Sequence, residues 1–168
     1  VLSCKKSKHR SIRWHCGTSD IDAGSASSGI TTDTVTTLTI TGFTVGTGSN
    51  RKLVLAASWE NGSSSISATW NGTQHFTVAA NSGGGRIAAI LYLDNPTPGT
   101  GNIVVTFGGN TGSRVGVVSL TGVAGGVSAT STATGTTGSL TTLVDQSWIL
   151  GAYTTNITDG VIPSMTHR

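Results

Sequence analysis

The sequence predicts an all-β protein, in which two antiparallel sheets form a jelly-roll-like β-sandwich and an extended N-terminal arm precedes it. Three observations predict this fold class. Short apolar runs alternate with turns rich in Gly, Ser, Thr and Asn from residue 31 to residue 155, no stretch has the period of an amphipathic helix, and 10% of the residues are charged. A chain of 168 residues is also long enough to bury one core.

The chain divides into a basic arm with a polar linker at residues 1–33 and a sandwich domain at residues 34–168. The arm carries five basic residues and no acidic one: Lys5, Lys6, Lys8, Arg10 and Arg13. The net charge is +3, so the rest of the chain, with five basic and seven acidic residues, stands at −2. Such an arm binds nucleic acid, acidic lipid or an acidic neighbour, or is a solvated tail. Nucleic-acid contact is therefore expected, if anywhere, at residues 5–13.

Both cysteines lie in the arm. Cys4 and Cys16 are spaced to form a disulfide that closes a loop of about a dozen residues, and free thiols are the alternative. His9 and His15 lie nearby, but the spacing of the four side chains does not match a zinc finger. No metal and no cofactor are therefore expected.

The first strands are predicted by alternation and by turn chemistry. Residues 35–43 alternate Leu38 and Ile40 with threonines, which indicates a half-buried strand. Residues 53–59 form a continuous apolar run, which suits a central strand. Residues 66–70 and 75–78 alternate on either side of Asn71-Gly72, which is a strong hairpin signal. Residues 18–33, before the first strand, show no periodicity and are expected to be an extended linker.

The later strands follow the same logic. Residues 86–93 are the most apolar run, and the glycine cluster before them and Pro96 after them favour a strand over a helix. Residues 103–107 alternate apolar side chains, and residues 114–120 follow a glycine turn. Residues 127–143 alternate weakly, as in an edge strand with a loop. Residues 148–153 are the last predicted strand.

The sequence contains few side chains in arrangements that could act in catalysis, so no enzymatic activity is expected. The acidic residues lie in loops or at strand ends, and nothing pairs two of them across a cleft as glycoside hydrolysis requires. His75 is the sole histidine of the predicted sandwich before residue 155, and no nucleophile elbow precedes it. Asp20 and Asp22 lack the further ligands of a calcium loop.

Aromatic side chains and sequons supply the candidate binding and modification sites. Trp59 is expected in the core, whereas Trp70, beside a turn, is expected to be exposed and is the candidate for stacking on a ligand. The sequons at Asn61, Asn71 and Asn156 are candidates for N-glycosylation, although the first two also suit plain turns.

Residues 50–153 resemble an uncharacterised jelly-roll-like module that recurs in secreted, cell-surface and phage-associated proteins of prokaryotes. The matching segments are NRKLVL at 50–55, SWE at 58–60, ATWNGT at 68–73, LYL at 91–93, PGT at 98–100, IVVTF at 103–107 and VVSLTGV at 117–123. The resemblance implies a β-sandwich in an extracellular or virion setting. It implies no catalytic residues.

The chain departs from this pattern after residue 152, where such modules add one more hydrophobic strand. An open sheet edge would then be filled by a strand from a second copy, because unpaired backbone groups are adhesive. Val35, Leu38 and Ile40 are the donor-strand candidates, and a chain without residues 1–47 is expected to be a soluble monomer. Alternatively, Val161-Ile162 closes the sheet within one chain.

Together these features predict a non-enzymatic structural subunit of an extracellular assembly, either a pilus-like filament or a virion surface. Copies of the chain are the expected partners, joined through sheet edges and the N-terminal arm. The alternative function is a carbohydrate-binding or adhesin module of a secreted or cell-surface protein, with surface glycans as partners. No apolar run is long enough for a membrane-spanning helix.

Overall fold

The computed structural model describes residues 20–60, 63–123, 126–133, 138–141, 143 and 149–154. These residues contain no helix, which confirms the prediction of an all-β protein. No helix in this part of the chain could therefore cross a membrane. The strands are β1 (Asp20–Val45), β2 (Lys52–Glu60), β3 (Ile66–Trp70), β4 (Gln74–His75), β5 (Thr77–Asn81), β6 (Arg86–Asp94) and β7 (Gly99–Thr121).

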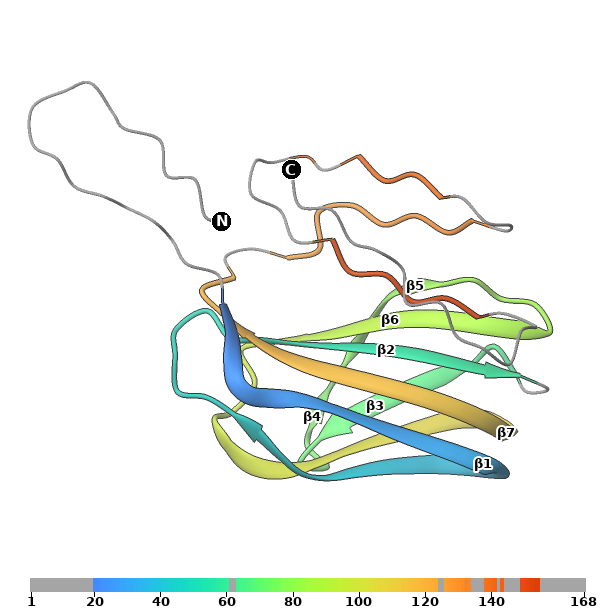
Figure 1. Ribbon diagram of the computed structural model, residues 1–168, viewed down its shortest axis with the longest axis horizontal. Coiled ribbons are helices and arrows are strands. Elements are labelled where there is room, and N and C mark those ends of the chain that lie inside the picture. Colours follow the sequence, from blue (N-terminus) through green and yellow to red (C-terminus); the bar gives the residue numbers. More distant parts are fainter. Residues whose placement is uncertain are drawn as a thin grey trace, which may run out of the picture.

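The two longest strands, β1 and β7, form one antiparallel ribbon. Their pairing runs from Asp20 opposite Thr121 to Val45 opposite Gly99, and its register breaks on both sides of Val35. Figure 1 shows that both strands fold back at one end of the molecule, so that their two halves lie in different layers. A single ribbon thereby contributes to both sheets, as a jelly-roll-like sandwich requires.

Each half of the ribbon pairs with different neighbours. The second half of β7 pairs with β2, β2 pairs with β6, and β6 pairs with β5; we call this layer the β2 sheet. The first half of β7 pairs with β3, and β3 pairs with β4; we call this layer the β3 sheet. All of these pairings are antiparallel, so the predicted two-sheet sandwich is confirmed.

The core lies between the two sheets and follows the predicted alternation. In β2, Leu53, Leu55 and Trp59 are buried in the core, and in β7 Ile103 and Val105 are fully buried. Burying such alternating side chains from two facing sheets supplies the main driving force for this fold. The rest of the core cluster is Leu38, Ile40, Phe43, Val45, Ala57, Ile66, Ala68, Trp70, Phe76, Ile87, Ala89, Leu91, Phe107, Val115 and Val117.

The predicted hairpin at the Asn71-Gly72 turn is confirmed in part: β3 pairs with β4, whereas residues 77–78 of the predicted second strand belong to β5 and pair with β6. Asn71 has φ = 51° and Gly72 has φ = 71°, the positive values that a type I′ turn requires. The Asn71 side-chain oxygen accepts a hydrogen bond from the Asn102 N–H at 3.1 Å, which attaches the turn to β7. Phe76 then separates β4 from β5, so the chain passes from the β3 sheet to the β2 sheet here as well.

Three expectations about strand limits differ from the structure. The glycine turn expected between residues 107 and 114 is not found, because β7 is a single strand from Gly99 to Thr121. Strand β1 begins at Asp20, so backbone pairing extends into the segment expected to be a linker. The strands predicted within 127–143 and 148–153 are wrong at the described positions, which form no strand. In residues 149–154 burial still alternates, with Leu150, Ala152 and Thr154 half-buried. The alternation therefore indicated that one face of this segment is half-buried. Such burial does not require backbone hydrogen bonds to a neighbouring strand.

Candidate assembly site

Strand β1 lies at the edge of both sheets. Among the described residues it pairs with β7 alone, so its second edge carries no ladder within that part of the chain. An edge strand directs N–H and C=O groups outward along its length, and such groups are a template for pairing with another chain. This strand is therefore the candidate site for self-association.

The second half of β1 supplies part of the core. Leu38, Ile40, Phe43 and Val45 are each at most 5% exposed, and Leu38 and Ile40 lie opposite Val105 and Ile103 of β7. Val35 is half-buried. Leu38 and Ile40 thus occupy the core of their own chain, with Val35 at its margin. The donor-strand assignment of the three residues stays a prediction.

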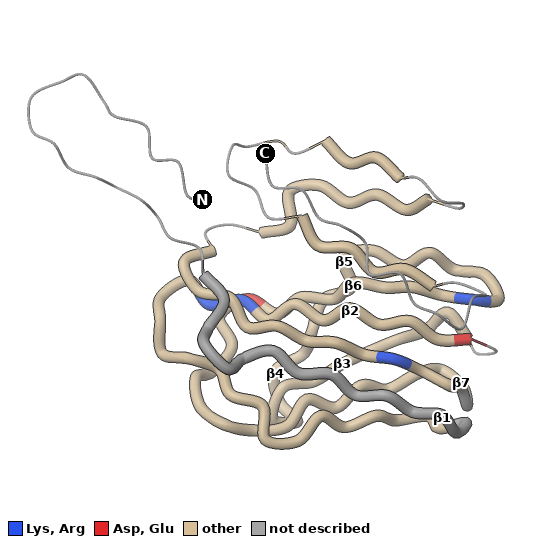
Figure 2. Tube along the Cα trace, in the orientation of Figure 1, with Lys and Arg blue, Asp and Glu red and all other residues tan. Residues whose placement is uncertain are grey.

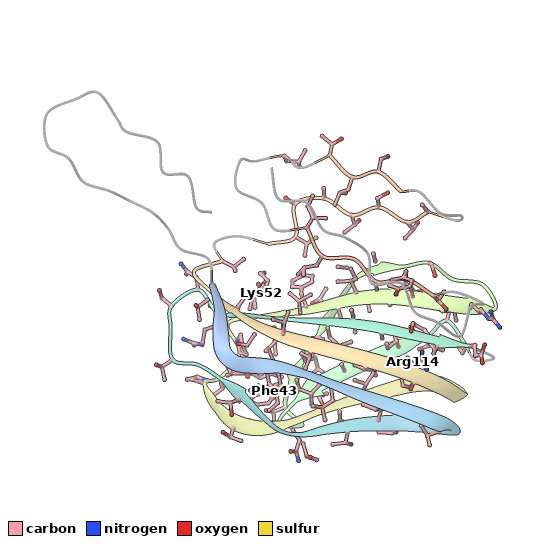
Figure 3. The ribbon with its side chains drawn as sticks, viewed as in Figure 1. Phe43, Lys52 and Arg114 are labelled. Atoms are coloured by element: carbon pink, nitrogen blue, oxygen red, sulfur yellow. The ribbon has the colours of Figure 1, made fainter. Side chains whose placement is uncertain are left out.

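A bulge in β1 brings two further side chains into this segment. The pairing register shifts between Ile40 and Phe43, and Gly42 lies in the left-handed region with φ = 67°. A bulge adds one residue to the strand and so reverses which side chains face inward. Phe43 and Val45 therefore point into the core, and Phe43 lies between the two layers in Figure 3. Sequence reasoning missed both residues, although Gly42 was a signal for a bulge.

A buried lysine marks one end of the sandwich. Lys52 at the start of β2 is 5% exposed, and its ammonium contacts the carboxylate of Asp94, which lies directly opposite at the end of β6. The ammonium also lies 4.9 Å from the centroid of the Tyr92 ring. Sequence reasoning did not pair Lys52 with Asp94. The available signal was a Lys before one apolar run and an Asp after another, which antiparallel pairing places together.

The same end holds a small polar pocket of about 210 Å³, lined by Asn50, Arg51, Asp94, Asn95 and Val123. Arg51 Nε donates to the Pro96 carbonyl at 2.9 Å, and Nη1 donates to the Gly48 carbonyl at 2.6 Å. These bonds join the loops around the pocket. Its volume is below the range of about 300–1,000 Å³ that ligand sites usually have. We therefore assign these side chains to holding the loops together.

The Lys52–Asp94 pair gives a testable prediction for stability. Asp94→Ala removes the partner of a buried ammonium and is expected to lower the free energy of unfolding by about 1–3 kcal/mol. We expect less than the loss from a fully buried pair, because the Asp94 side chain is 45% exposed. Lys52→Met keeps the apolar stem without the charge, and we expect a change below about 1 kcal/mol. Urea unfolding of both variants checks this, and an equal loss in both would contradict it.

The structure places the remaining predicted site residues as follows. Trp70 is fully buried, so the expectation that it is exposed for ligand stacking is wrong. Its ring packs edge-on against Phe43 with centroids 6.2 Å apart, and its Nε1 donates to the Thr97 carbonyl at 3.0 Å. Proximity to a turn did not expose it, because Phe43 and Thr97 cover it from other segments. Asn71 is exposed, and its glycosylation stays a prediction.

Several predicted features lie outside the described residues. These are Cys4, Cys16, the basic positions 5–13, the sequons at Asn61 and Asn156, and Val161-Ile162. Within the described part of the chain, no group of three or more His, Cys, Asp or Glu side chains is placed to hold a metal ion. Glu60 pairs with Arg86 at 3.1 Å on the surface. The described acidic side chains Glu60 and Asp94 are thus both in ion pairs.

The sequence matches no family model, no curated protein and no solved structure. The features of the chain that bear on its function are therefore the edge strand β1, the charge distribution and the resemblance of residues 50–153 to a secreted and phage-associated module.

Proposed function

We propose that this chain is a non-enzymatic structural subunit of an extracellular assembly, a filament or a virion surface, whose copies associate by exchanging β1. The sparse charge, the hydroxyl-rich composition and the resemblance to secreted and phage-associated modules support the extracellular setting. The edge position of β1 supports association through this strand.

One observation carries the proposal. The second half of β1 places four apolar side chains in the core while β1 itself is held through one edge among the described strands. Such a strand can leave its own sandwich and occupy the equivalent position in a neighbouring copy, where it makes the same contacts with β7 and with the core. Exchange of an identical element is a low-cost route to oligomers, because the interface reuses contacts already selected for folding.

The alternative of a carbohydrate-binding module gains no support from the two tryptophans that the structure describes. Trp59 and Trp70 are both buried, and their indole N–H groups donate to the backbone carbonyls of Ser63 and Thr97. Neither ring can stack on a sugar in this fold. We therefore retain the structural role as the proposal.

A pair of cysteines can report directly whether β1 is exchanged. The Oγ1 atoms of Thr44 and Thr100 lie 3.0 Å apart across the β1–β7 pair, which suits a disulfide. In a chain with Cys4→Ser and Cys16→Ser, the variant Thr44→Cys/Thr100→Cys is oxidised under native conditions. If β1 is exchanged, the disulfide joins different chains, and a non-reducing gel is expected to show a ladder of covalent oligomers.

The matched control places the disulfide between strands that do not include β1. Ser58 of β2 lies opposite Ala88 of β6, and Ser58→Cys/Ala88→Cys should therefore run as a monomer on the same gel. A ladder from the first variant and a monomer from the control support exchange of β1. Monomer from both variants under conditions where oxidation is complete would show that β1 stays in its own chain, and the proposal would fail.

A further inference from the structure

The outer surface of the β3 sheet has no ionisable side chain apart from His75. Its strands comprise residues 35–45, 66–70, 74–75 and 99–107, and none of these positions is Asp, Glu, Lys or Arg. Figure 2 shows this layer without charged positions, whereas the charged positions lie on the strands of the β2 sheet and at its ends. This layer follows the sparse charge of the whole chain, in which 10% of the residues are charged against about a quarter in a typical soluble domain.

Side chains that carry a hydroxyl or a methyl group form two rows across this surface. Thr37, Thr106 and Ser67 lie side by side on β1, β7 and β3, and Thr39, Val104 and Thr69 form the next row. We call these six residues the hydroxyl face. Thr37, Thr39, Ser67 and Thr106 are exposed, and Thr69 and Val104 are half-buried. Neighbouring positions are about 4.8 Å apart across strands and about 7 Å apart along them.

The two outer surfaces of the sandwich differ in how they are covered. On the β2 sheet, Val54 and Leu120 are at most 7% exposed although neither belongs to the core cluster between the sheets. Figure 1 shows the described part of the chain after β7 on that same side of the molecule. The hydroxyl face is on the opposite side, and among the described residues its Thr37, Thr39, Ser67 and Thr106 side chains are exposed.

We propose that the hydroxyl face packs against the hydroxyl face of a second copy. This contact rests on the proposed assembly. Exchange of β1 would join subunits one after another along an assembly, and the hydroxyl face would join subunits of two assemblies that lie side by side. A neutral surface is self-complementary, because no charge is buried without a partner when two copies meet. Thr and Ser both donate and accept hydrogen bonds, so hydroxyls of the two copies can satisfy each other.

The twist of the β3 sheet suits a second copy of the chain better than a flat partner surface. Adjacent strands rotate by about 20–25° relative to one another, so three strands present a twisted surface. Two sheets with the same twist pack well at about 30° to each other. A flat partner surface would contact a twisted sheet over a smaller area. The small side chains of the face also allow close approach of the two backbones.

The size of the face limits what it can do alone. Three strands about 4.8 Å apart and about 20 Å long cover roughly 300 Å² per copy. Specific stable complexes bury roughly 800 Å² per partner. The face is therefore too small to hold an isolated dimer, and it acts where many copies are already connected through β1.

The experiment uses the full chain and compares two lysine substitutions. Thr106→Lys places a charge in the centre strand of the hydroxyl face, whereas Thr77→Lys places the same charge at an exposed position of β5. Negative-stain electron microscopy counts paired and single assemblies, and sedimentation measures the bundled fraction. We expect paired assemblies from the parent chain and from Thr77→Lys. Thr106→Lys should reduce pairing at least about tenfold, and salt should partly restore it by screening the facing charges.

The outcomes separate this inference from the proposed function. Single assemblies from the parent chain, or unchanged pairing in Thr106→Lys, would overturn the hydroxyl-face contact while leaving β1 exchange intact. Monomers alone, with no covalent ladder from Thr44→Cys/Thr100→Cys, would overturn both. Single parent assemblies that bind insoluble polysaccharide, and lose that binding in Thr106→Lys, would assign the face to a glycan and overturn the contact.

Discussion

A chain that lacks residues 1–45 is expected not to fold by itself, and to recover its fold when a peptide of residues 34–45 is added. The deletion removes Leu38, Ile40, Phe43 and Val45 from the core. Burying four side chains of this kind contributes about 6–12 kcal/mol. This is of the same size as the net stability of an ordinary domain, about 5–15 kcal/mol. For a chain without residues 1–47 the sequence alone predicted a soluble monomer, and the burial of these four side chains changes that expectation.

The measurement is the near-ultraviolet circular dichroism and elution volume of the truncated chain with and without peptide. Two altered peptides make the test specific. A peptide with Leu38→Asp and Ile40→Asp should not rescue, because both side chains enter the core. A peptide with Thr37→Ser and Thr39→Ser should rescue, because both side chains are exposed. A truncated chain that is folded and stable without peptide would show that β1 is dispensable and would remove the basis for strand exchange.

Trp70→Ala is expected to lower the free energy of unfolding by about 3–5 kcal/mol, the largest loss from a single substitution among those considered. Trp70 is fully buried, and its ring contacts that of Phe43 at an interplanar angle of 84°. The truncation leaves a cavity beside β1 and removes the donor to the Thr97 carbonyl. Since Phe43 belongs to β1, the variant should also loosen the strand that we propose is exchanged.

Urea unfolding followed by far-ultraviolet circular dichroism measures this loss. Trp70→Phe is the matched control, because it keeps an aromatic ring in the core and removes the indole N–H. We expect it to lose about 1–3 kcal/mol, mainly from an unsatisfied carbonyl and a smaller ring. A loss below about 1 kcal/mol in Trp70→Ala would contradict the central position of this side chain and would reopen its assignment to ligand binding.

The structure gives β1 two properties that rarely coincide. The strand is important for stability, because its second half completes the core, and it is also exposed, because its outer edge has no partner among the described strands. Proteins usually protect such edges with charge, with Pro or by keeping them short. Residues 35–45 contain neither charge nor Pro, which is consistent with an edge that meets another copy.

Local sequence determined much of the fold. The alternation in residues 66–70 and 103–107, the apolar runs at 53–59 and 86–93, and the Asn71-Gly72 turn all correspond to elements of the structure. These features were readable because the period of side-chain burial in a strand and the positive φ of a turn are properties of a few neighbouring residues.

Tertiary structure alone decided how those strands combine. The fold-back of the β1–β7 ribbon, the Lys52–Asp94 pair and the burial of Trp70 under Phe43 each join positions more than twenty residues apart. Alternation shows that one face of a strand is buried, but it does not say which segment covers it. For the same reason the sequence indicated a strand at 148–153, where the described residues form no strand. Pairing depends on which edges remain open after the core has formed, and that is a property of the whole sandwich.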